Sequence, residues 1–399
     1  MTSETQLSDQ DVVIVAAART PMGGFQGAFA SQSAPELGAA AIKSLLERTG
    51  LQPDQVEEVL MGNVLNAGVG QAPARQAALG AGLDLPTRCT TVSKVCGSGM
   101  KAAMLAHDQI RAGSCDIAIA GGMESMTKAP YFIAKARDGL RLGHGEIKDH
   151  MFVDGLEDAY TGRAMGTFAQ EKADAEGITR EQMDEYALQS LSRANQAIEE
   201  GWFEEETVPV TFSSRRGEVT VTTDEQPGNA RPDKIPGLKP AFAKDGTITA
   251  ANSSSISDGA AALLLMSAAR ARQLNLQPLA KICGHTGHAQ HPSEFTITPI
   301  AAIRKLLNEL HWHKDDVDLF EINEAFAMVA MLAIRGLDLD IDKVNINGGA
   351  CALGHPIGAS GARILVTLIY ALKRLGKKRG VASLCIGGGE ATAIAIEML

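Results

Sequence analysis

The sequence predicts an α/β protein whose core is built twice, with a separate segment inserted into the first copy. Three observations support this fold class. Short apolar runs alternate with amphipathic helical patterns, as expected of sheets covered by helices on both faces. Residues 41–61 align without gaps on residues 302–322, at an offset of 261 positions. Residues 125–250 differ from both copies because they carry more charge and several prolines.

The elements follow the same order in both copies. An apolar run at 12–18 is the first expected strand. Each copy then contains a helix, a polar loop and a strand, followed by a glycine turn, a helix and a strand that ends in glycines. The corresponding ranges are 41–61 and 97–122 in the first copy, and 302–322 and 359–388 in the second. Because helices and strands alternate, we expect parallel sheets.

Residues 125–250 are expected to form an inserted loop domain that caps the duplicated core. A long helical pattern begins at Thr179, a good N-cap, and stops before Gly201. Residues 215–223 indicate a hairpin-like pair of strands, and 259–272 return the chain to the core through a strand and a helix. The predicted boundaries are 1–124 for the first part of the N-terminal half, 125–250 for the insertion, 251–275 for the completion of that half, and 276–399 for the C-terminal half.

Composition and charge limit the possible functions. The chain has 399 residues and a formal net charge of −10, which argues against nucleic acid as a partner. The longest strongly apolar runs, 12–18 and 260–266, are too short to span a membrane. Residues 1–11 are polar and acidic, unlike a secretory or transit signal, so a cytoplasmic protein is expected. The six cysteines include no Cys-x-x-Cys pair and are expected to be thiols.

Cys96 is the first candidate catalytic residue. It follows a strand-like segment at the start of a predicted helix, whose dipole and free N–H groups should lower the thiol pKa and bind an oxyanion. A small core residue at a turn is the structural alternative. The dinucleotide-binding pattern Gly-x-Gly-x-x-Ala at 97–102 is a second functional reading. It is disfavoured because Asp116 begins a strand, whereas that fingerprint needs an acid at a strand's end.

A single histidine, His355, lies in a glycine-rich run at 347–363. Two interpretations remain open at this point: a base that titrates near neutral pH beside a ligand, or an ordinary loop residue before a helix. Cys385 follows an apolar strand and precedes three glycines, and Asn323 follows the duplicated strand of the second copy. Because α/β folds place ligands at the carboxyl ends of their strands, these side chains should share one edge with Cys96.

Three further histidines, His285, His288 and His291, recur at intervals of three residues and suggest a metal site. They are expected in a loop that contains glycine and proline, with no acidic or cysteine partner nearby. We therefore expect no metal site in this protein.

Together, these motifs resemble those of the thiolase family over nearly the whole chain, from the segment at 17–21 onward. Each motif alone is weak, whereas four reactive loops in the family's order on a duplicated core are highly specific. Within the family, the resemblance is greatest to bacterial acetyl-CoA acetyltransferases. The other matching segments lie at 70–76, 95–99, 120–125, 258–261, 323–326, 354–361 and 385–389.

The resemblance implies a five-layer αβαβα core with an inserted loop domain, and an acyltransferase that catalyses a reversible Claisen condensation. Cys96 would carry the acyl group after His355 takes its proton, and Cys385 would deprotonate the α-carbon of a second acetyl-CoA. The products would be a 3-ketoacyl-CoA, such as acetoacetyl-CoA, and CoA, and the reverse reaction is thiolytic cleavage. One oxyanion would be held by His355 and a water on Asn323. The other would be held by the backbone N–H groups of Cys96 and Gly387.

The resemblance also implies that the chain acts in fatty acid metabolism, with acyl-CoA and CoA as its small-molecule partners. No resident cofactor is expected, since coenzyme A is itself substrate and product. The chain should form a homo-oligomer, at least a dimer and by expectation a tetramer, through the loop around 137–150. The residues expected to bind the acyl-CoA are Ser254, Ala250, Leu156, Met165, Ala325 and Phe326, with Arg231 as a candidate for the phosphates.

Departures from the family pattern leave the acyl-chain preference open. Ser93 stands where the family often has Asn, and Ala164 stands where short-chain biosynthetic members often carry His. Glu390 also departs from the residues that commonly follow the three glycines. A broader-chain degradative 3-ketoacyl-CoA thiolase is therefore an alternative. A non-catalytic acyl-CoA- or lipid-binding protein of the same fold need not keep all four reactive residues, and a ketoacyl synthase would have a histidine in place of Cys385.

Overall fold

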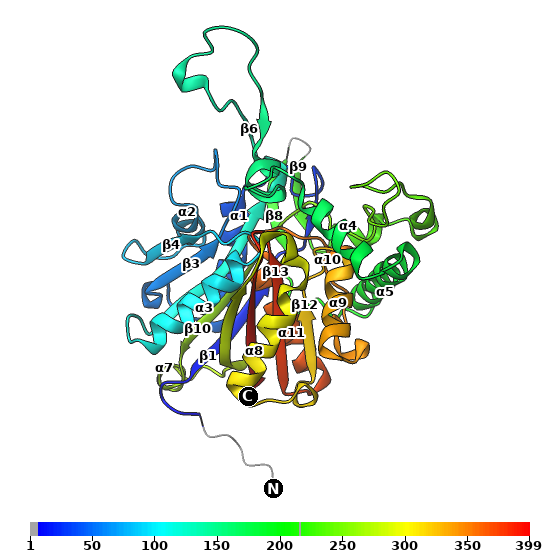
Figure 1. Ribbon diagram of the computed structural model, residues 1–399. Helices are drawn as coiled ribbons and strands as arrows, with labels where there is room; N and C mark the ends of the chain where they lie inside the picture. The colour runs from blue at the N-terminus through cyan, green and yellow to red at the C-terminus, as the bar shows by residue number, and fades with distance from the viewer. Residues whose placement is uncertain (1–6, 215–216) are drawn as a thin grey trace.

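The computed structural model describes residues 7–214 and 217–399, and its α/β core is built from two copies of one unit (Figure 1). Four strands of the first copy have counterparts in the second. The pairs are β1 (Val12–Arg19) and β11 (Ala280–Ala289), β3 (Glu58–Gly62) and β12 (Leu319–Ile322), β5 (Ile117–Ser125) and β13 (Arg379–Ile386), and β10 (Ser257–Ser267) and β14 (Glu390–Met398). The first copy has an additional edge strand, β4 (Arg88–Val92).

All of these strands belong to one sheet, in the order β12-β13-β14-β11-β1-β10-β5-β3-β4, with β2 (Gly23–Gly24) paired to β10. The two copies meet at β1 and β11, where Val13 faces Lys281 and Ile14 faces Ala280. The expectation of parallel sheets holds only in part: β3 pairs parallel with β4 and β5, and β12 with β13, but β10 and β14 run antiparallel to both of their neighbours. β14 follows β13 through a tight glycine turn, and such a short connection permits only antiparallel pairing.

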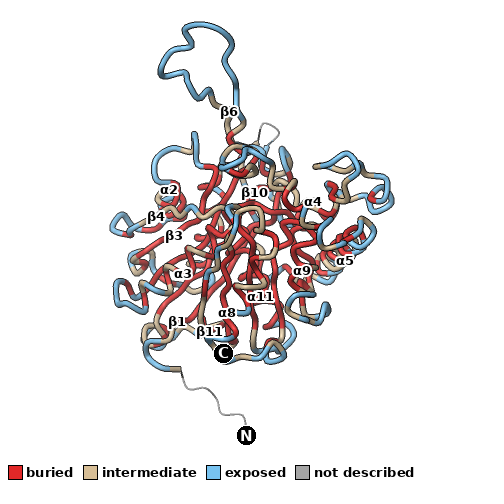
Figure 2. Tube along the Cα trace, viewed as in Figure 1, coloured by how far each residue is buried: buried red, intermediate tan, exposed pale blue. Residues whose placement is uncertain are grey.

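Helices and the two arms of the sheet form five layers, as expected. α3 (Ser98–Arg111) and α11 (Ser360–Leu375) lie between the arms and share one apolar core with both. A second core lies under the outer helices α1 (Ala34–Thr49) and α2 (Pro73–Gly80). A third lies under α8 (Thr298–Leu310) and α9 (Ala327–Leu337). Figure 2 shows the buried trace concentrated in these layers.

The two central helices cross at equivalent glycines near their amino ends. A Cβ atom on Gly361 would lie 2.5 Å from the backbone nitrogen of Met100, and one on Gly99 would lie 2.9 Å from that of Ala362. Only glycine permits so close an approach of the two backbones. The loops that precede α3 and α11 are therefore held side by side at the top of the core.

The insertion covers this end of the core. It contains α4 (Met165–Ala175), α5 (Arg180–Glu199), α6 (Glu225–Asn229) and the hairpin of β8 (Val210–Ser214) and β9 (Gly217–Val221). Thr179 caps α5 as predicted, through a capping box with Gln182. The hairpin begins earlier than the predicted 215–223, of which residues 215 and 216 lie outside the described ranges. Between β6 (Tyr131–Phe132) and β7 (Lys148–Asp149), a long loop extends away from the body (Figure 1).

Two short helices complete the core, α7 (Ala268–Gln273) after β10 and α10 (Ala350–Leu353) before the turn that carries His355. The expected loop around His285 and His288 is wrong, because both residues belong to β11. Pairing of β11 with β14 along its whole length overrides the weak strand propensity of its glycines. Within the two described ranges, no helix combines the length and the apolar character that crossing a membrane requires.

Candidate active site

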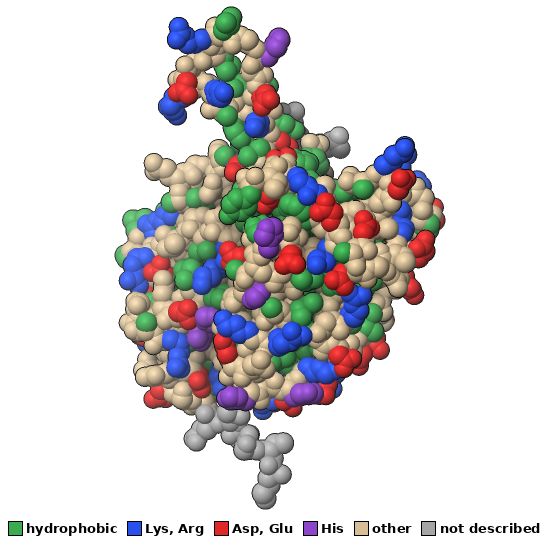
Figure 3. Space-filling model, in the orientation of Figure 1, with side chains coloured by type: hydrophobic (Ala, Val, Ile, Leu, Met, Phe, Trp, Pro, Cys, Tyr) green, Lys and Arg blue, Asp and Glu red, His purple; other side chains and the backbone are tan. Residues whose placement is uncertain are grey.

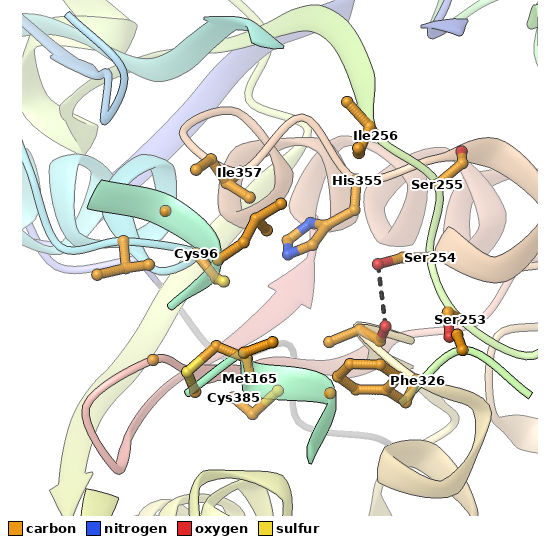
Figure 4. A pocket seen from close by; sticks show the side chains of 18 of the residues that line it. Cys96, Met165, Ser253, Ser254, Ser255, Ile256, Phe326, His355, Ile357 and Cys385 are labelled. Atoms are coloured by element: carbon orange, nitrogen blue, oxygen red, sulfur yellow. Dashed lines mark hydrogen bonds between the residues drawn. The ribbon is translucent and has the colours of Figure 1, made fainter. Parts of the chain in front are cut away.

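A cavity of about 540 Å³ lies between the duplicated core and the insertion (Figure 4). Cys96, His355, Cys385 and Gly387 all contribute to its wall, so the predicted convergence on one edge is confirmed for the two thiols and the imidazole. The same wall contains six of the residues expected to bind acyl-CoA, which are Leu156, Met165, Ala250, Ser254, Ala325 and Phe326. Arg231 does not line the cavity and is exposed at the start of a short helical segment.

Cys96 lies in the tight loop between β4 and α3. The loop is fixed by Ser98, whose Oγ accepts a hydrogen bond from the backbone N–H of Lys94 at 2.8 Å and donates to the carbonyl of Val95 at 2.7 Å. Val95 has a φ of +44°, a conformation that costs energy for a β-branched residue. α3 begins only at Ser98, so Cys96 precedes the helix and its side chain faces the cavity.

The expected lowering of the Cys96 pKa is wrong for the free enzyme. Burial raises the pKa of the Cys96 thiol to about 11. The backbone N–H groups of Gly387 and Cys96 hydrogen-bond to the sulfur and lower its pKa, while the charge of Glu124 raises it. A thiolate in an apolar wall loses its solvation. This loss raises the pKa of Cys96 more than the nearby backbone N–H dipoles lower it. The resting nucleophile is therefore a protonated thiol with two N–H donors already beside it.

His355 precedes α11 in a turn that only glycine can form. Gly354 has a φ of +103°, and a Cβ atom there would overlap the Ser257 hydroxyl. The backbone N–H of His355 is shared between the Ser255 carbonyl and Ser257 Oγ, each at 3.2 Å. Burial and the charge of Arg363 lower the pKa of His355 to about 3, so the expected titration near neutral pH is also wrong. The ring is neutral at physiological pH.

The tautomer of His355 follows from its neighbours. Ser360 Oγ donates to the carbonyl of Pro356 at 3.0 Å and lies 2.6 Å from His355 Nδ1. Because the serine proton is used, this contact favours Nδ1 as the nitrogen that carries the ring hydrogen and donates it to Ser360. Nε2 then holds the lone pair, and among the described residues it has no partner. Figure 4 shows the imidazole directed toward Cys96.

Asn323 and Cys385 complete the reactive group. Asn323 follows β12 and does not line the cavity; its Nδ2 lies 3.5 Å from His355 Nδ1, and its buried Oδ1 has no partner in the described chain. Cys385 lies near the end of β13 and lines the same cavity. Burial, and then the neighbouring thiol of Cys96, raise the pKa of Cys385 well above its ordinary value. Two thiols and one neutral imidazole therefore face the same apolar space.

Sequence reasoning assigned no positioning role to two buried glutamates that hold these loops. Glu124, at the end of β5, accepts hydrogen bonds from the backbone N–H groups of Val64, Leu65 and Gly358 at 2.9–3.1 Å. It thereby ties the turn after His355 to the first copy. Burial raises the pKa of Glu124 to about 7. Its place inside the matching segment 120–125 was the available signal, although that segment was not assigned a role.

Glu324 anchors the other side of the same glycine-rich run. Its carboxylate accepts from Ser190 Oγ at 2.8 Å, Asn345 Nδ2 at 2.9 Å and the backbone N–H of Cys351 at 3.1 Å. Tyr186 Oη also donates to it at 3.1 Å. The insertion helix α5 and the His355 loop are therefore joined through one buried carboxylate, next to Asn323.

Known proteins share this architecture. Models of the thiolase N-terminal and C-terminal domains match residues 12–269 and 276–398. The acetyl-CoA acetyltransferases of Cupriavidus necator and Pseudomonas aeruginosa are 51% and 49% identical to the chain, each over 97% of this chain and 99% of the relative. The structure of the Bacillus anthracis acetyl-CoA acetyltransferase matches with a TM-score of 0.95 at 44% identity, covering 98% of this chain and 99% of that one.

A thiolase from Ascaris suum, solved in complex with coenzyme A, matches with a TM-score of 0.92 at 41% identity, covering 98% of this chain and 100% of that one. These domain models span both copies of the core. They include Cys96, Cys385 and His355. By fold, by sequence and by the order of its reactive loops, this protein belongs to the thiolase family.

Proposed function

We propose that the protein is an acetyl-CoA acetyltransferase, which condenses two acetyl-CoA molecules to acetoacetyl-CoA and CoA and catalyses the reverse thiolysis. The observation that carries this proposal is the convergence of Cys96, Cys385 and His355 on one apolar cavity. A non-catalytic acyl-CoA-binding protein would need the cavity but neither thiol. The names of the relatives from Cupriavidus necator and Bacillus anthracis agree with the proposal.

Acyl transfer is the first half-reaction. His355 Nε2 takes the proton from Cys96 Sγ as the sulfur attacks the thioester carbonyl of acetyl-CoA. Negative charge develops on the carbonyl oxygen, and the N–H groups of Cys96 and Gly387 that flank the sulfur are placed to stabilise it. The carbon–sulfur bond to CoA then breaks, and His355 returns the proton to the departing thiolate. Cys96 and His355 are both uncharged in the resting enzyme. His355 therefore acts as a general base and is not half of a preformed ion pair.

Condensation is the second half-reaction. His355 Nε2 takes the proton of Cys385, and the resulting thiolate, a strong base because of its high pKa, removes a proton from the α-carbon of a second acetyl-CoA. The enolate oxygen accepts from Nε2–H of the protonated His355 and from a water held by Asn323. The carbanion attacks the acyl carbon on Cys96, which leaves as a thiolate and receives the proton from His355, while Cys385 keeps the proton of the α-carbon. The active site returns to its starting state.

The acyl-chain preference is the open part of this function, and a broader-chain degradative thiolase is the second candidate. The cavity favours it through its apolar lining, which includes Phe152, Phe242 and Ile357, and through the small side chain of Ala164. Cleavage rates measured across 3-ketoacyl-CoA substrates of increasing length distinguish the two. A maximum at acetoacetyl-CoA supports the acetyltransferase, and a maximum at longer chains supports the alternative.

The decisive test mixes the purified protein with acetoacetyl-CoA and CoA and follows loss of the magnesium–enolate absorbance. We expect cleavage by the native protein and its loss in Cys96→Ser. Cys89→Ser is the matched control, because Cys89 is a free thiol that does not line the cavity. If no chain length is cleaved, the enzyme assignment is wrong, and if Cys96→Ser keeps full activity, the nucleophile is misassigned.

We further propose a homotetramer in the cytoplasm. The loop between β6 and β7 carries Leu142, whose side chain is 99% exposed, beside exposed Leu140 and Ile147. Such a group of apolar side chains is usually covered by a partner, and a second copy of the same loop is a fitting one. Six free thiols are typical of a reducing compartment. Light scattering should give a tetramer mass for the native chain and a smaller mass for Leu142→Asp.

A further inference from the structure

A second cluster of reactive side chains lies outside the cavity, where α3 approaches β11. His107 Nδ1, Asp108 Oδ1 and His285 Nε2 form a triangle with sides of 3.1 Å between the two histidines, 2.8 Å from His285 to the carboxylate and 3.1 Å from His107 to it. All three potential ligand atoms converge on one point. None of these residues lines the cavity described above.

Hydrogen bonding alone satisfies this cluster poorly. Each histidine nitrogen can donate a proton to Asp108, but the two nitrogens also face each other at 3.1 Å. If both carry a proton, two donors meet, and if one does not, its lone pair competes with the carboxylate for a single proton. The rings meet edge to face at 89° with their centroids 4.9 Å apart. A single cation at the centre satisfies all three ligand atoms at once.

We propose that His107, Asp108 and His285 form a binding site for a divalent transition-metal ion such as Zn²⁺. Two imidazole nitrogens and a carboxylate oxygen are a common zinc ligand set, with bonds of about 2.0–2.1 Å. Tetrahedral geometry at that bond length separates the ligand atoms by about 3.3 Å. The observed triangle therefore has to widen by only a few tenths of an ångström. Asp108 lies at the surface, so the fourth position is open to water.

The location of the site indicates its role. His107 and Asp108 belong to α3 of the first copy, and His285 belongs to β11 of the second, 178 positions away from His107. The ion would thus join the two halves of the core. His107 lies nine residues beyond the start of α3, about 13 Å along the helix from the Cys96 end. The metal is therefore structural and takes no part in acyl transfer.

The test titrates the full-length, chelator-treated protein with Zn²⁺ and, separately, with Co²⁺. We expect one ion per chain, and a rise in Tm of about 3 °C when free Zn²⁺ is 100-fold above its dissociation constant. His107→Gln and His285→Gln should each weaken binding at least tenfold and remove the Tm shift. His288→Gln is the matched control, because His288 shares β11 but is not part of the cluster, and it should bind as the native protein does.

The cavity also offers thiols and an imidazole, so the two locations must be distinguished. Cys96→Ser should still bind the ion at the proposed site, and bound Co²⁺ should show visible d–d bands without a thiolate charge-transfer band. Binding that survives both His107→Gln and His285→Gln, or that disappears only in Cys96→Ser, overturns the proposal. So does the absence of binding. Thiolysis by metal-free His285→Gln at the native rate would show that the acetyltransferase function stands independently of this outcome.

Figure 3 shows that charged side chains of both signs are interspersed over the visible face of the body. Within the described residues, His107, Asp108 and His285 are the one group of three or more histidine, cysteine or acidic side chains close enough to share an ion.

Discussion

Nδ1 of His355 lies 2.6 Å from Oγ of Ser360, and that hydroxyl is itself committed to the Pro356 carbonyl. The pair leaves the other ring nitrogen as a proton acceptor in the cavity. Ser360 is a positioning residue, because it acts on the substrate only through the imidazole.

Replacing Ser360 by Ala should therefore slow acylation without weakening substrate binding. Nδ1 loses its acceptor, so the ring can rotate or change tautomer, and we expect kcat to fall about tenfold, which corresponds to about 1.4 kcal/mol. KM should change little, and rapid-quench measurement of acetyl-enzyme formation reports the step directly. Ser255→Ala is the control, since Ser255 lines the cavity without a side-chain bond to the ring. An unchanged acylation rate in Ser360→Ala would refute the tautomer assignment.

Removing the second thiol should separate the two half-reactions. In Cys385→Ala, Cys96 and His355 remain, so we expect acetyl-enzyme to form from acetyl-CoA and to accumulate, while condensation falls by at least a thousandfold. Intact-protein mass spectrometry detects the acetyl group, and a coupled assay follows acetoacetyl-CoA. If acylation disappears together with condensation, Cys385 is also needed for the first step and the division of labour is wrong.

Burial of His355 should make the free energy of unfolding depend on pH. Its folded pKa of about 3 lies below the ordinary value of about 6.5, so between these values the unfolded chain binds a proton that the folded chain does not. Stability from this residue is complete above pH 6.5 and is lost as the pH falls toward 3. Relative to His355→Gln, the native protein should lose about 2 kcal/mol between pH 7.5 and pH 5 in urea unfolding. Parallel curves for the two proteins would contradict the depressed pKa.

Because the central helices cross so closely, adding one methyl group at the crossing should greatly lower the free energy of unfolding. In Gly361→Ala, the new Cβ would lie 2.5 Å from the Met100 backbone nitrogen, so α3 and α11 must move apart. We expect a loss of about 3 kcal/mol in unfolding free energy, together with reduced activity. Gly228→Ala, where a Cβ meets nothing within 4 Å, should change stability by less than about 0.5 kcal/mol. Equal stabilities of the two variants would show that the crossing tolerates separation.

Much of the fold and the reactive group could be predicted because both rest on local signals. The repeat at 41–61 and 302–322 fixed the duplication, and the glycine turns marked the loops that carry Cys96, His355 and Cys385. Strand direction could not be predicted in the same way. It depends on which strand each segment meets, and the β10 segment reaches its place only after the whole insertion.

The pKa values and the cluster of His107, Asp108 and His285 could not be predicted from the sequence for a related reason. A helix end near Cys96 is visible in the sequence, whereas the depth of burial that outweighs it is a property of the assembled cavity. His285 was paired with its sequence neighbours His288 and His291, although its true partners lie on α3. Contacts across so many residues leave no periodic pattern to find. The prediction of Arg231 rested on the family resemblance alone, and in the structure this residue does not line the cavity.

The glycine crossing of α3 and α11 has a consequence for symmetry. Two copies of one unit, joined through equivalent helices, define an approximate twofold axis that runs between Gly99 and Gly361. A true twofold would place like beside like, so a thiol would face a thiol and an imidazole would face an imidazole. Proton transfer needs unlike partners, and here Cys96 precedes one helix and His355 precedes the other. The backbone can be nearly symmetric, but proton transfer requires that the two copies carry different side chains near the axis.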